Sequence, residues 1–351
     1  MVFSLRIGGQ CFKDSKEMKE GLFNYFKNYF DCFARRWKMG LDLKFKILNE
    51  DRLRKLEEPF SMGEIKEAVW SCDGFKALGS DGFNLCFLRK CWEIVKNDLF
   101  GLMSEFFIIG KLEKSINSSF ITLIPKVENP IDISDFRPIC LVSSLYKIVS
   151  KVLSRRLREI VEEVVTDTQC AFIRGRQIYD EVLIANELIH SVKKKGGDGG
   201  YLILKLDFSK AYDYVRWNFL ELVMFKMRFG DKWRGWMLEC ISTARAAVII
   251  IGSSSKEFGF RRGLQQGDLL SPFLFILVME VLHLALDNVV ELGLIVGFKN
   301  IIHGLSFSHL QFTDDTILFL KADEKEVSNV KHILRCFEIF SGLGINFKKS
   351  L

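Results

Sequence analysis

The chain has 351 residues, of which 48% are hydrophobic and 13% aromatic, so it can bury a sizeable core in two or more structural units. Its formal net charge of +6 suits a polyanionic partner without requiring one. The longest apolar runs are shorter than the roughly 18 to 20 residues of a membrane span, and the N-terminus lacks a secretory signal. We therefore expect a globular protein of the cytoplasm or nucleus that is neither membrane-inserted nor secreted.

The cysteines and histidines show no metal-binding or disulfide pattern. The nine cysteines include no Cys-x-x-Cys pair and are typical of thiols in a reducing compartment. The five histidines form no His-Glu-x-x-His pattern; they are His190, His283, His303, His309 and His332. We expect neither a disulfide framework nor a structural zinc site.

The N-terminal part contains helical patterns but no chemical motif. Residues 1–60 mix aromatic and basic side chains and are interpreted as a leader or linker. Ser61 followed by Glu64 predicts a capped helix over Ile65–Trp70, and a second helix is expected from about Leu85 to Phe107. Residues 61–117 are thus predicted to form a helical extension.

A strand, a loop and a basic amphipathic helix follow. The apolar run Phe120–Pro125 predicts a strand, and the polar run Lys126–Asp135 predicts a loop. Between Leu145 and Val165, apolar residues recur at intervals of three and four residues, which predicts an amphipathic helix. Its basic residues share one narrow arc: Lys147, Lys151, Arg155 and Arg158. This basic stripe either faces a nucleic-acid backbone or is an ordinary solvated face.

Two segments place carboxylates at the ends of predicted strands. The β-rich run from Tyr201 ends at Asp207, and a buried strand tolerates such a charge only if it is paired or bound to metal. Asp314 and Asp315 lie between two short apolar runs, which predicts a β-hairpin with both carboxylates at its tip. Taken alone, the Asp-Asp pair favours the interpretation as an ordinary polar turn, since Asp is a common turn residue.

Adjacent carboxylates repel, so a hairpin that carries them favours a bound cation, and oxygen ligands suit Mg²⁺. Two such ions about 4 Å apart can activate a primer 3′-hydroxyl and stabilise a leaving pyrophosphate. Asp207 and Asp314 would be the main ligands, and Asp315 would assist. This hypothesis predicts nucleotide transfer.

Further polar segments suit a nucleotide. The Gly-rich loop Arg261–Asp268 precedes Ser271 and Pro272, which are expected at the N-cap and first position of an apolar helix. Lys126 and Arg137 are isolated cations on loops that could neutralise a triphosphate.

The succession of these segments resembles the reverse transcriptases of non-long-terminal-repeat retrotransposons, the LINE class, and most closely their plant members. The resemblance extends from about Lys76 to the last residue. Its segments, in chain order, are Lys76–Phe83, Lys126, Arg137, Gln169-x-x-Phe172-x-x-Gly175-Arg176, Asp207–Tyr212, Gln266-Gly267, Ser271-Pro272, Phe312–Asp315 and Ser341–Ser350.

The resemblance implies an α+β right-hand polymerase, with fingers at 118–200 and, at 201–351, a palm of mixed or antiparallel sheet with packed helices. It assigns catalytic and metal-binding roles to Asp207, Asp314 and Asp315, with two Mg²⁺ ions and Mn²⁺ as an alternative. The other implied nucleotide-binding residues are Lys126, Arg137, Phe208, Tyr212, Gln266, Gly267 and Lys349. Tyr212 occupies the position that excludes a 2′-hydroxyl, and Lys349 matches a lysine that assists pyrophosphate departure. The implied partners are an RNA template, a DNA primer and deoxynucleotides; the resemblance assigns no oligomeric state.

The chain departs from the family pattern in ways that keep a second hypothesis open. Gln265 stands where the family usually has Arg, and Leu269 where it has Pro. We expect the chain to lack the thumb and the upstream endonuclease of the family, as in a fragment of a larger polyprotein or a decayed copy. The alternative to an RNA-directed DNA polymerase is therefore an inactive remnant that still binds nucleic acid. A group II intron maturase is a third hypothesis, which a following maturase domain would support.

Overall fold

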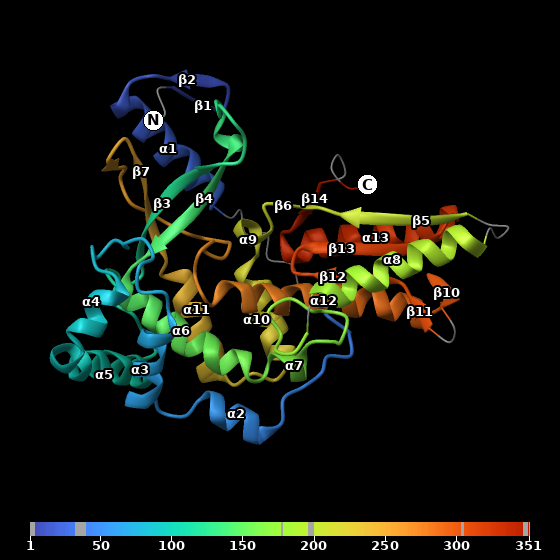
Figure 1. Cartoon of the computed structure of the whole chain (residues 1–351), viewed down its shortest axis with the longest axis horizontal. Helices are drawn as coiled ribbons and strands as arrows, with labels where there is room; N and C mark the ends of the chain where they lie inside the picture. The colour runs from blue at the N-terminus through green and yellow to red at the C-terminus, as the bar shows by residue number, and fades with distance from the viewer. Residues whose placement is uncertain are drawn as a thin grey trace. The chain divides into compact units, whose positions relative to one another are not determined.

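The computed structural model describes residues 4–31, 40–176, 178–195, 200–302, 305–346 and 350. The chain divides into two compact units, and both are discontinuous in the sequence. The first unit comprises Met1–Arg35, Arg54–Arg156 and Gly230–Ser271; the second comprises Arg36–Leu53, Leu157–Phe229 and Pro272–Leu351 (Figure 1). The sequence analysis expected boundaries after residues 60, 117 and 200. Those boundaries separate the subdomains of a polymerase, not compact units, so they stay a prediction.

The first unit contains a mixed sheet in the order β4–β3–β7–β8, with β9 also paired to β7. β3 is antiparallel to β4 and parallel to β7. The strand predicted at Phe120–Pro125 is confirmed as part of β3. The strands are β3 (Ser118–Pro125), β4 (Phe136–Val142), β7 (Arg245–Ile250), β8 (Ser253–Ser254) and β9 (Phe258–Gly259), and a 3-10 turn, η1 (Ile133–Asp135), precedes β4.

The helices of the first unit begin and end largely where the sequence signals lie. Ser61 and Glu64 form the predicted capping box at the start of α3, because each side chain accepts a hydrogen bond from the other's backbone N–H. The single helix predicted from Leu85 to Phe107 is wrong, since the backbone turns out of helical geometry at Cys91. The helices are α3 (Met62–Ser71), α4 (Leu85–Lys90), α5 (Trp92–Ile109), α11 (Asp231–Ser242) and α6 (Ser144–Arg158), whose last two residues belong to the second unit.

Part of the expected leader is folded into the first unit. It forms the antiparallel pair β1 (Leu5–Ile7) and β2 (Gln10–Phe12), followed by α1 (Ser15–Tyr29). Just after α1, Phe30 lies against the Phe260 ring at 4.2 Å between centroids, and both side chains are buried. This aromatic packing beside β9 accounts for the aromatic-rich N-terminal composition.

The second unit contains an antiparallel sheet in the order β12–β13–β5. Two short pairs, β14–β6 and β10–β11, accompany it. The strands are β5 (Tyr201–Leu206), β6 (Phe208–Ser209), β10 (Phe298–Ile302), β11 (Leu305–Phe307), β12 (His309–Phe312), β13 (Asp315–Lys321) and β14 (Gly344–Ile345).

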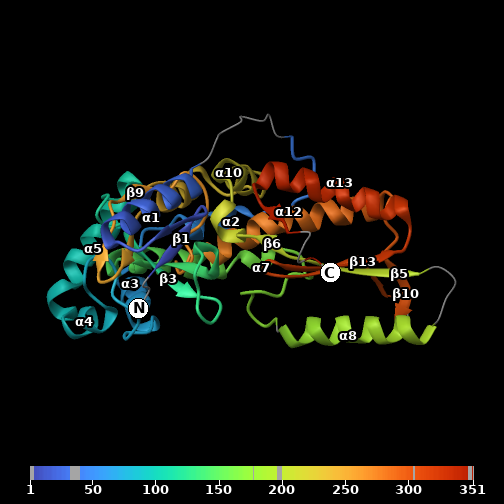
Figure 2. The ribbon, with the colours of Figure 1, turned by 90° about the horizontal axis from the view of Figure 1, so that it is seen from above.

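Helices cover both faces of this sheet. Figure 2 shows α8 on one side and α12 and α13 on the other. The core on the α8 side contains Ala185, Leu188, Phe298, Leu310 and Phe319. The helices are α7 (Val161–Val164), α8 (Ile178–Lys195), α9 (Ala211–Tyr214), α10 (Trp217–Lys226), α12 (Ser271–Glu291) and α13 (Glu324–Ser341), and α2 (Glu50–Leu56) begins in this unit and ends in the first.

The apolar helix α12 bears on the expectation that the chain does not insert into a membrane. It has 21 residues and a mean hydropathy of 2.0 in its most apolar window, so it is long and apolar enough to cross a membrane. The uninterrupted apolar runs in the sequence are shorter than a membrane span because polar residues interrupt this helix. Of that window, 72% is buried inside the structure. Such burial is typical of a central core helix, and length and composition alone are weak evidence for a span.

Candidate active site

The hairpin with Asp-Asp at its tip is confirmed. β12 and β13 pair so that Phe312 lies opposite Asp315, which leaves Thr313 and Asp314 as a two-residue turn. Thr313 has a φ of 54°, an uncommon conformation for a β-branched residue, and its side chain is buried. The fold thus holds the turn in a strained conformation that exposes Asp314 and Asp315.

The strand register brings Asp207 to the same edge. Thr316 of β13 pairs with Leu206 of β5, so one step further Asp207 faces Asp315. Leu206 and Thr316 are fully buried, and side chains alternate along a strand, so Asp207 and Asp315 share the opposite face. The three predicted carboxylates are therefore neighbours at one end of the sheet.

A lysine that the sequence analysis missed compensates this negative charge. Lys205 Nζ lies 2.9 Å from Asp315 Oδ1. The hydrogen bond to Asp315 raises the pKa of Lys205, and the charges of Asp207 and Asp314 add to the effect. Lys205 precedes Asp207 by two residues and so lies on the same face, a period-two signal that could have identified it.

Backbone contacts fix the end of β5. The Asp207 carbonyl accepts a hydrogen bond from the Asn346 N–H at 2.8 Å, and the Asn346 amide donates to Asp207 Oδ2 at 3.3 Å. Ile345 pairs with Phe208, whose side chain is buried. The C-terminal motif thus contacts the first carboxylate directly, whereas Lys349 lies outside the described residues.

The segment around Gln169 supports the Thr313–Asp314 turn, here called the carboxylate turn. Gln169 is 1% exposed, and its Oε1 accepts hydrogen bonds from the N–H groups of Thr313 at 3.3 Å and Ala171 at 3.1 Å. Arg176 donates to the carbonyls of Gln169 and Thr166, each at 2.6 Å. The family motif from Gln169 to Arg176 therefore lies against the turn that carries Asp314.

Tyr212 also lies in the second unit. Its ring stacks on Phe275 at 4.5 Å between centroids and 18° between planes. Burial is the main cause that raises the pKa of its hydroxyl, and the charge of Asp314 adds to it. The phenol therefore stays protonated beside the carboxylate turn.

The predicted triphosphate and loop residues lie in the first unit. Lys126 and Arg137 are exposed near one end of the β3–β4 pair, and Lys126 Nζ donates to the Ser134 carbonyl at 3.0 Å. The Gln266 carbonyl accepts from the Cys140 N–H at 2.8 Å. Gly267 has a φ of 107°, and a Cβ there would lie 2.8 Å from the Cys140 carbonyl oxygen, so only glycine fits.

The basic stripe of α6 makes contacts with protein. Lys147 Nζ donates to the Ala77 carbonyl at 3.1 Å, and burial lowers its pKa. Arg155 forms an ion pair with Glu67. Arg158 is exposed, with its guanidinium 5.5 Å from the centroid of the Phe273 ring. Contact with nucleic acid stays a prediction for this stripe, which also includes Lys151.

Comparison with known proteins decides the family. Residues 124–351 match the model of the family described as reverse transcriptase (RNA-dependent DNA polymerase). The chain belongs to this reverse transcriptase family. The α+β architecture of fingers and palm, inferred above from resemblance, is therefore the fold of this reverse transcriptase domain.

Curated relatives place the domain among non-LTR retrotransposons. It is 27% identical over 352 residues to the "Transposon TX1 uncharacterized 149 kDa protein" of Xenopus laevis, covering 97% of this chain and 26% of that protein. It is 28% identical to the R2 retrotransposable element Pol polyprotein of Popillia japonica, covering 66% of this chain and 31% of the relative. The chain thus spans about a quarter to a third of the length of these relatives. A solved telomerase from Candida tropicalis aligns with a TM-score of 0.45 at 14% identity, over 77% of this chain and 55% of that one.

Reverse transcriptase domains generally use divalent metal ions. The sheet edge that carries Asp207, Asp314 and Asp315, here called the carboxylate edge, fits such ions. Its donor set consists of oxygens, it lies at a sheet end, and two of the three carboxylates are exposed. The Lys205–Asp315 ion pair shows that the edge already attracts a cation.

Proposed function

We propose that this reverse transcriptase domain transfers deoxynucleotides to the 3′-end of a DNA primer on an RNA template. The supporting observation is the register of β5, β13 and β12, which brings Asp207, Asp314 and Asp315 to one edge. Family membership makes nucleotide transfer the reaction that this edge is expected to serve. Membership of the plant branch of non-LTR elements is also part of the proposal, on the resemblance of its motifs.

Asp207, Asp314 and Asp315 would hold two Mg²⁺ ions, and Mn²⁺ would fit the same oxygens. When bound, such ions supply activation of the primer hydroxyl and charge stabilisation at the departing pyrophosphate. The protein contributes position: Gln169 holds the turn through Thr313, and Asn346 holds Asp207. Lys205 keeps the carboxylates compensated before metal binds.

The remaining nucleotide-binding residues are assigned by their place in the family motifs. Tyr212 would select a deoxynucleotide, because its ring is held by Phe275 and can block a 2′-hydroxyl. Gln266 and Gly267 would line the nucleotide beside the template, with the Phe208 carbonyl near a metal. Lys126, Arg137 and Lys349 would neutralise the triphosphate and assist pyrophosphate departure.

One observation favours the alternative of a nucleic-acid-binding remnant. Gln265 stands where the family usually has Arg; it is 5% exposed, and neither atom of its amide has a hydrogen-bond partner among the described residues. An unpartnered buried amide destabilises the loop that precedes Gln266. A weakened loop would reduce nucleotide binding while leaving the carboxylate edge intact.

Primer extension on an RNA template with Mg²⁺ tests the proposal. Asp314→Asn should reduce incorporation by at least about 100-fold and leave template binding nearly unchanged, because it removes a metal ligand and no phosphate contact. Glu324→Gln is the matched control: it removes one charge from an exposed position in the same unit and should retain activity. Equal activity of Asp314→Asn and wild type would refute the assignment, and a folded, template-binding but inactive wild type would favour the remnant.

A further inference from the structure

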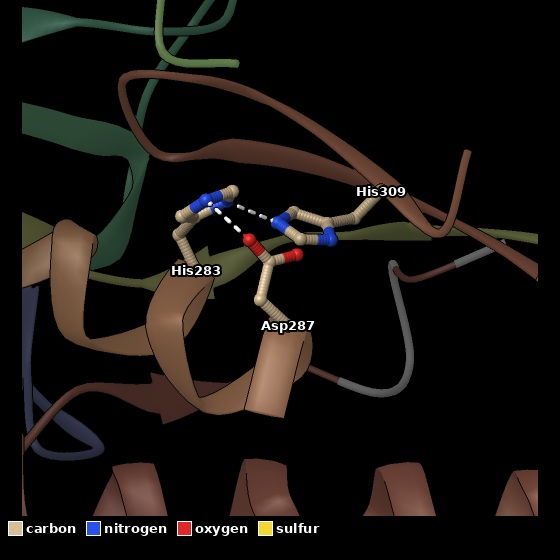
Figure 3. Close-up of side chains that lie close together, drawn as sticks. All are labelled: His283, Asp287 and His309. Carbon is tan, nitrogen blue, oxygen red and sulfur yellow. Dashed lines mark hydrogen bonds and ion pairs between the residues drawn. The ribbon is translucent and has the colours of Figure 1, made fainter. Parts of the chain in front are cut away.

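Two histidines and an aspartate, which no sequence motif connects, converge in the second unit. His283 and Asp287 lie one turn apart on α12, and His309 begins β12 (Figure 3). His283 Nε2 is 2.9 Å from Asp287 Oδ2, and His283 Nδ1 is 2.5 Å from His309 Nε2. One potential ligand atom from each residue lies within 4.8 Å of the others.

The donor chemistry separates this cluster from the carboxylate edge. Two imidazole nitrogens and one carboxylate oxygen form a donor set typical of Zn²⁺, whereas Mg²⁺ prefers oxygen alone. His283 and His309 are 2% and 3% exposed, while the Asp287 side chain is 48% exposed. The cluster is therefore largely enclosed, and Asp287 gives it an opening to solvent.

Neighbouring hydroxyls orient both rings. Ser308 Oγ lies 2.8 Å from His309 Nδ1, which leaves Nε2 directed toward His283. Thr168 Oγ1 lies 3.0 Å from His283 Nδ1, while Nε2 is directed toward Asp287. Hydrogen bonds to the second ring nitrogen are how proteins orient histidine ligands for metal.

We propose that His283, Asp287 and His309 form a binding site for Zn²⁺ or a similar late first-row divalent cation, with water completing a tetrahedral set. His283 and His309 would bind through Nε2, and small movements of the two rings would open space for the ion. The ion would join α12 to β12. Because β12 leads into the Thr313–Asp314 turn, this link would stiffen the strand that presents the carboxylates.

Metal titration of the chelator-treated full chain tests the site without any polymerase assay. Zn²⁺ binding is measured by calorimetry, and Co²⁺ binding by the visible absorption of a tetrahedral nitrogen and oxygen site. We expect one tight equivalent per chain in wild type and in Asp314→Asn, which separates this site from the carboxylate edge. An Asp314→Asn chain that lost this equivalent would contradict the proposal.

Variants of the ligands complete the test. Asp287→Asn should weaken binding at least about ten-fold and fold normally, because its side chain is half-exposed. His309→Ala should abolish tight binding, with circular dichroism to confirm folding, and the exposed His190→Ala is the matched control that should bind like wild type. Absence of a tight Zn²⁺ equivalent in wild type, or equal binding by Asp287→Asn, would show that the three side chains form only a hydrogen-bonded network.

Discussion

At the scale of single residues, the active edge depends on charge balance. Three carboxylates at one sheet end repel each other, and Lys205 offsets part of this repulsion through Asp315. In the proposed mechanism the same lysine competes with metal for Asp315, because the lysine and a bound ion need the same oxygen. Lys205 should therefore tune the metal concentration at which the domain works.

Lys205→Met is expected to lower the Mg²⁺ concentration for half-maximal primer extension by about two- to five-fold, since an exposed ion pair is worth up to about 1 kcal/mol. Its melting temperature should fall without Mg²⁺ and recover when Mg²⁺ is added. Lys321→Met, at the other end of the same sheet, is the control and should leave the Mg²⁺ dependence unchanged. A higher Mg²⁺ requirement in Lys205→Met would mean that the lysine assists metal binding instead.

At the scale of elements, the turn between β12 and β13 depends on a loop distant in sequence. Gln169→Leu removes the acceptor for the N–H groups of Thr313 and Ala171, and each unpaired buried group costs about 1–3 kcal/mol. We expect a lower melting temperature and a fall in kcat of about ten-fold, with template binding nearly unchanged.

Gln311 of β12 offers a matched control for this variant. It is fully buried, and its amide atoms have no hydrogen-bond partner among the described residues. Gln311→Leu should therefore leave stability unchanged or raise it. Thermal unfolding and single-turnover primer extension of both variants provide the measurement; equal kcat values for Gln169→Leu and wild type would exclude a positioning role.

A second element-scale dependence joins α6 to α3 in the first unit. Arg156 donates to the carbonyls of Leu56, Glu58 and Pro59 and to the Glu64 carboxylate, and its guanidinium lies 4.5 Å from the centroid of the Phe60 ring. Lysine cannot reproduce this planar set of donors. Arg156→Lys should destabilise the fold by about 1–3 kcal/mol, measured by urea unfolding. An unchanged midpoint would show that the contacts contribute nothing net.

The ion pair between Arg156 and Glu64 predicts that the stability of the fold depends on pH. Burial raises the pKa of Glu64, but hydrogen bonds from Arg156 and Ser61 outweigh it, so the pKa is lowered. A carboxyl group whose pKa is lowered in the folded state stabilises the fold. This stabilisation is fully present above the pKa of the unfolded chain, about 4.3, and is lost as the pH falls through the lower pKa of the folded state. Glu64→Gln should therefore melt below wild type at pH 7, and the difference should shrink toward pH 3. A constant difference would contradict the linkage.

At the scale of the whole molecule, the net charge of +6 should make binding to nucleic acid salt-dependent. Lys151→Gln with Arg155→Gln should weaken binding to any sequence and reduce the salt slope by up to about two. The ion pair of Arg155 with Glu67 does not prevent this role, because a phosphate can replace the carboxylate of an exposed pair.

Glu67→Gln provides the opposite change on the same surface. It releases Arg155 and should strengthen binding slightly, as measured by fluorescence anisotropy of a labelled RNA–DNA duplex across salt concentrations. If the salt slope of the double variant equals that of wild type, the basic stripe serves only the packing of α6.

Local sequence signals determined the capping box at Ser61, the strand at Phe120–Pro125 and the Asp314–Asp315 hairpin, because each depends on neighbouring residues. The ordered motifs also determined the family. These signals failed at Cys91, where the helical backbone is interrupted although no Gly, Pro or capping residue there predicts a helix end.

Only the tertiary structure decided which distant residues meet. The family motifs had already implied that Asp207 and Asp315 lie together, but strand register gave Lys205 its partner, and loop packing brought Gln169 to Thr313. Helix–sheet packing brought His283 to His309. Such contacts join segments from 26 to 144 residues apart. Spacing along a strand can place a side chain on a face, as for Lys205, but it does not specify the partner, because register and burial are set by how whole elements pack.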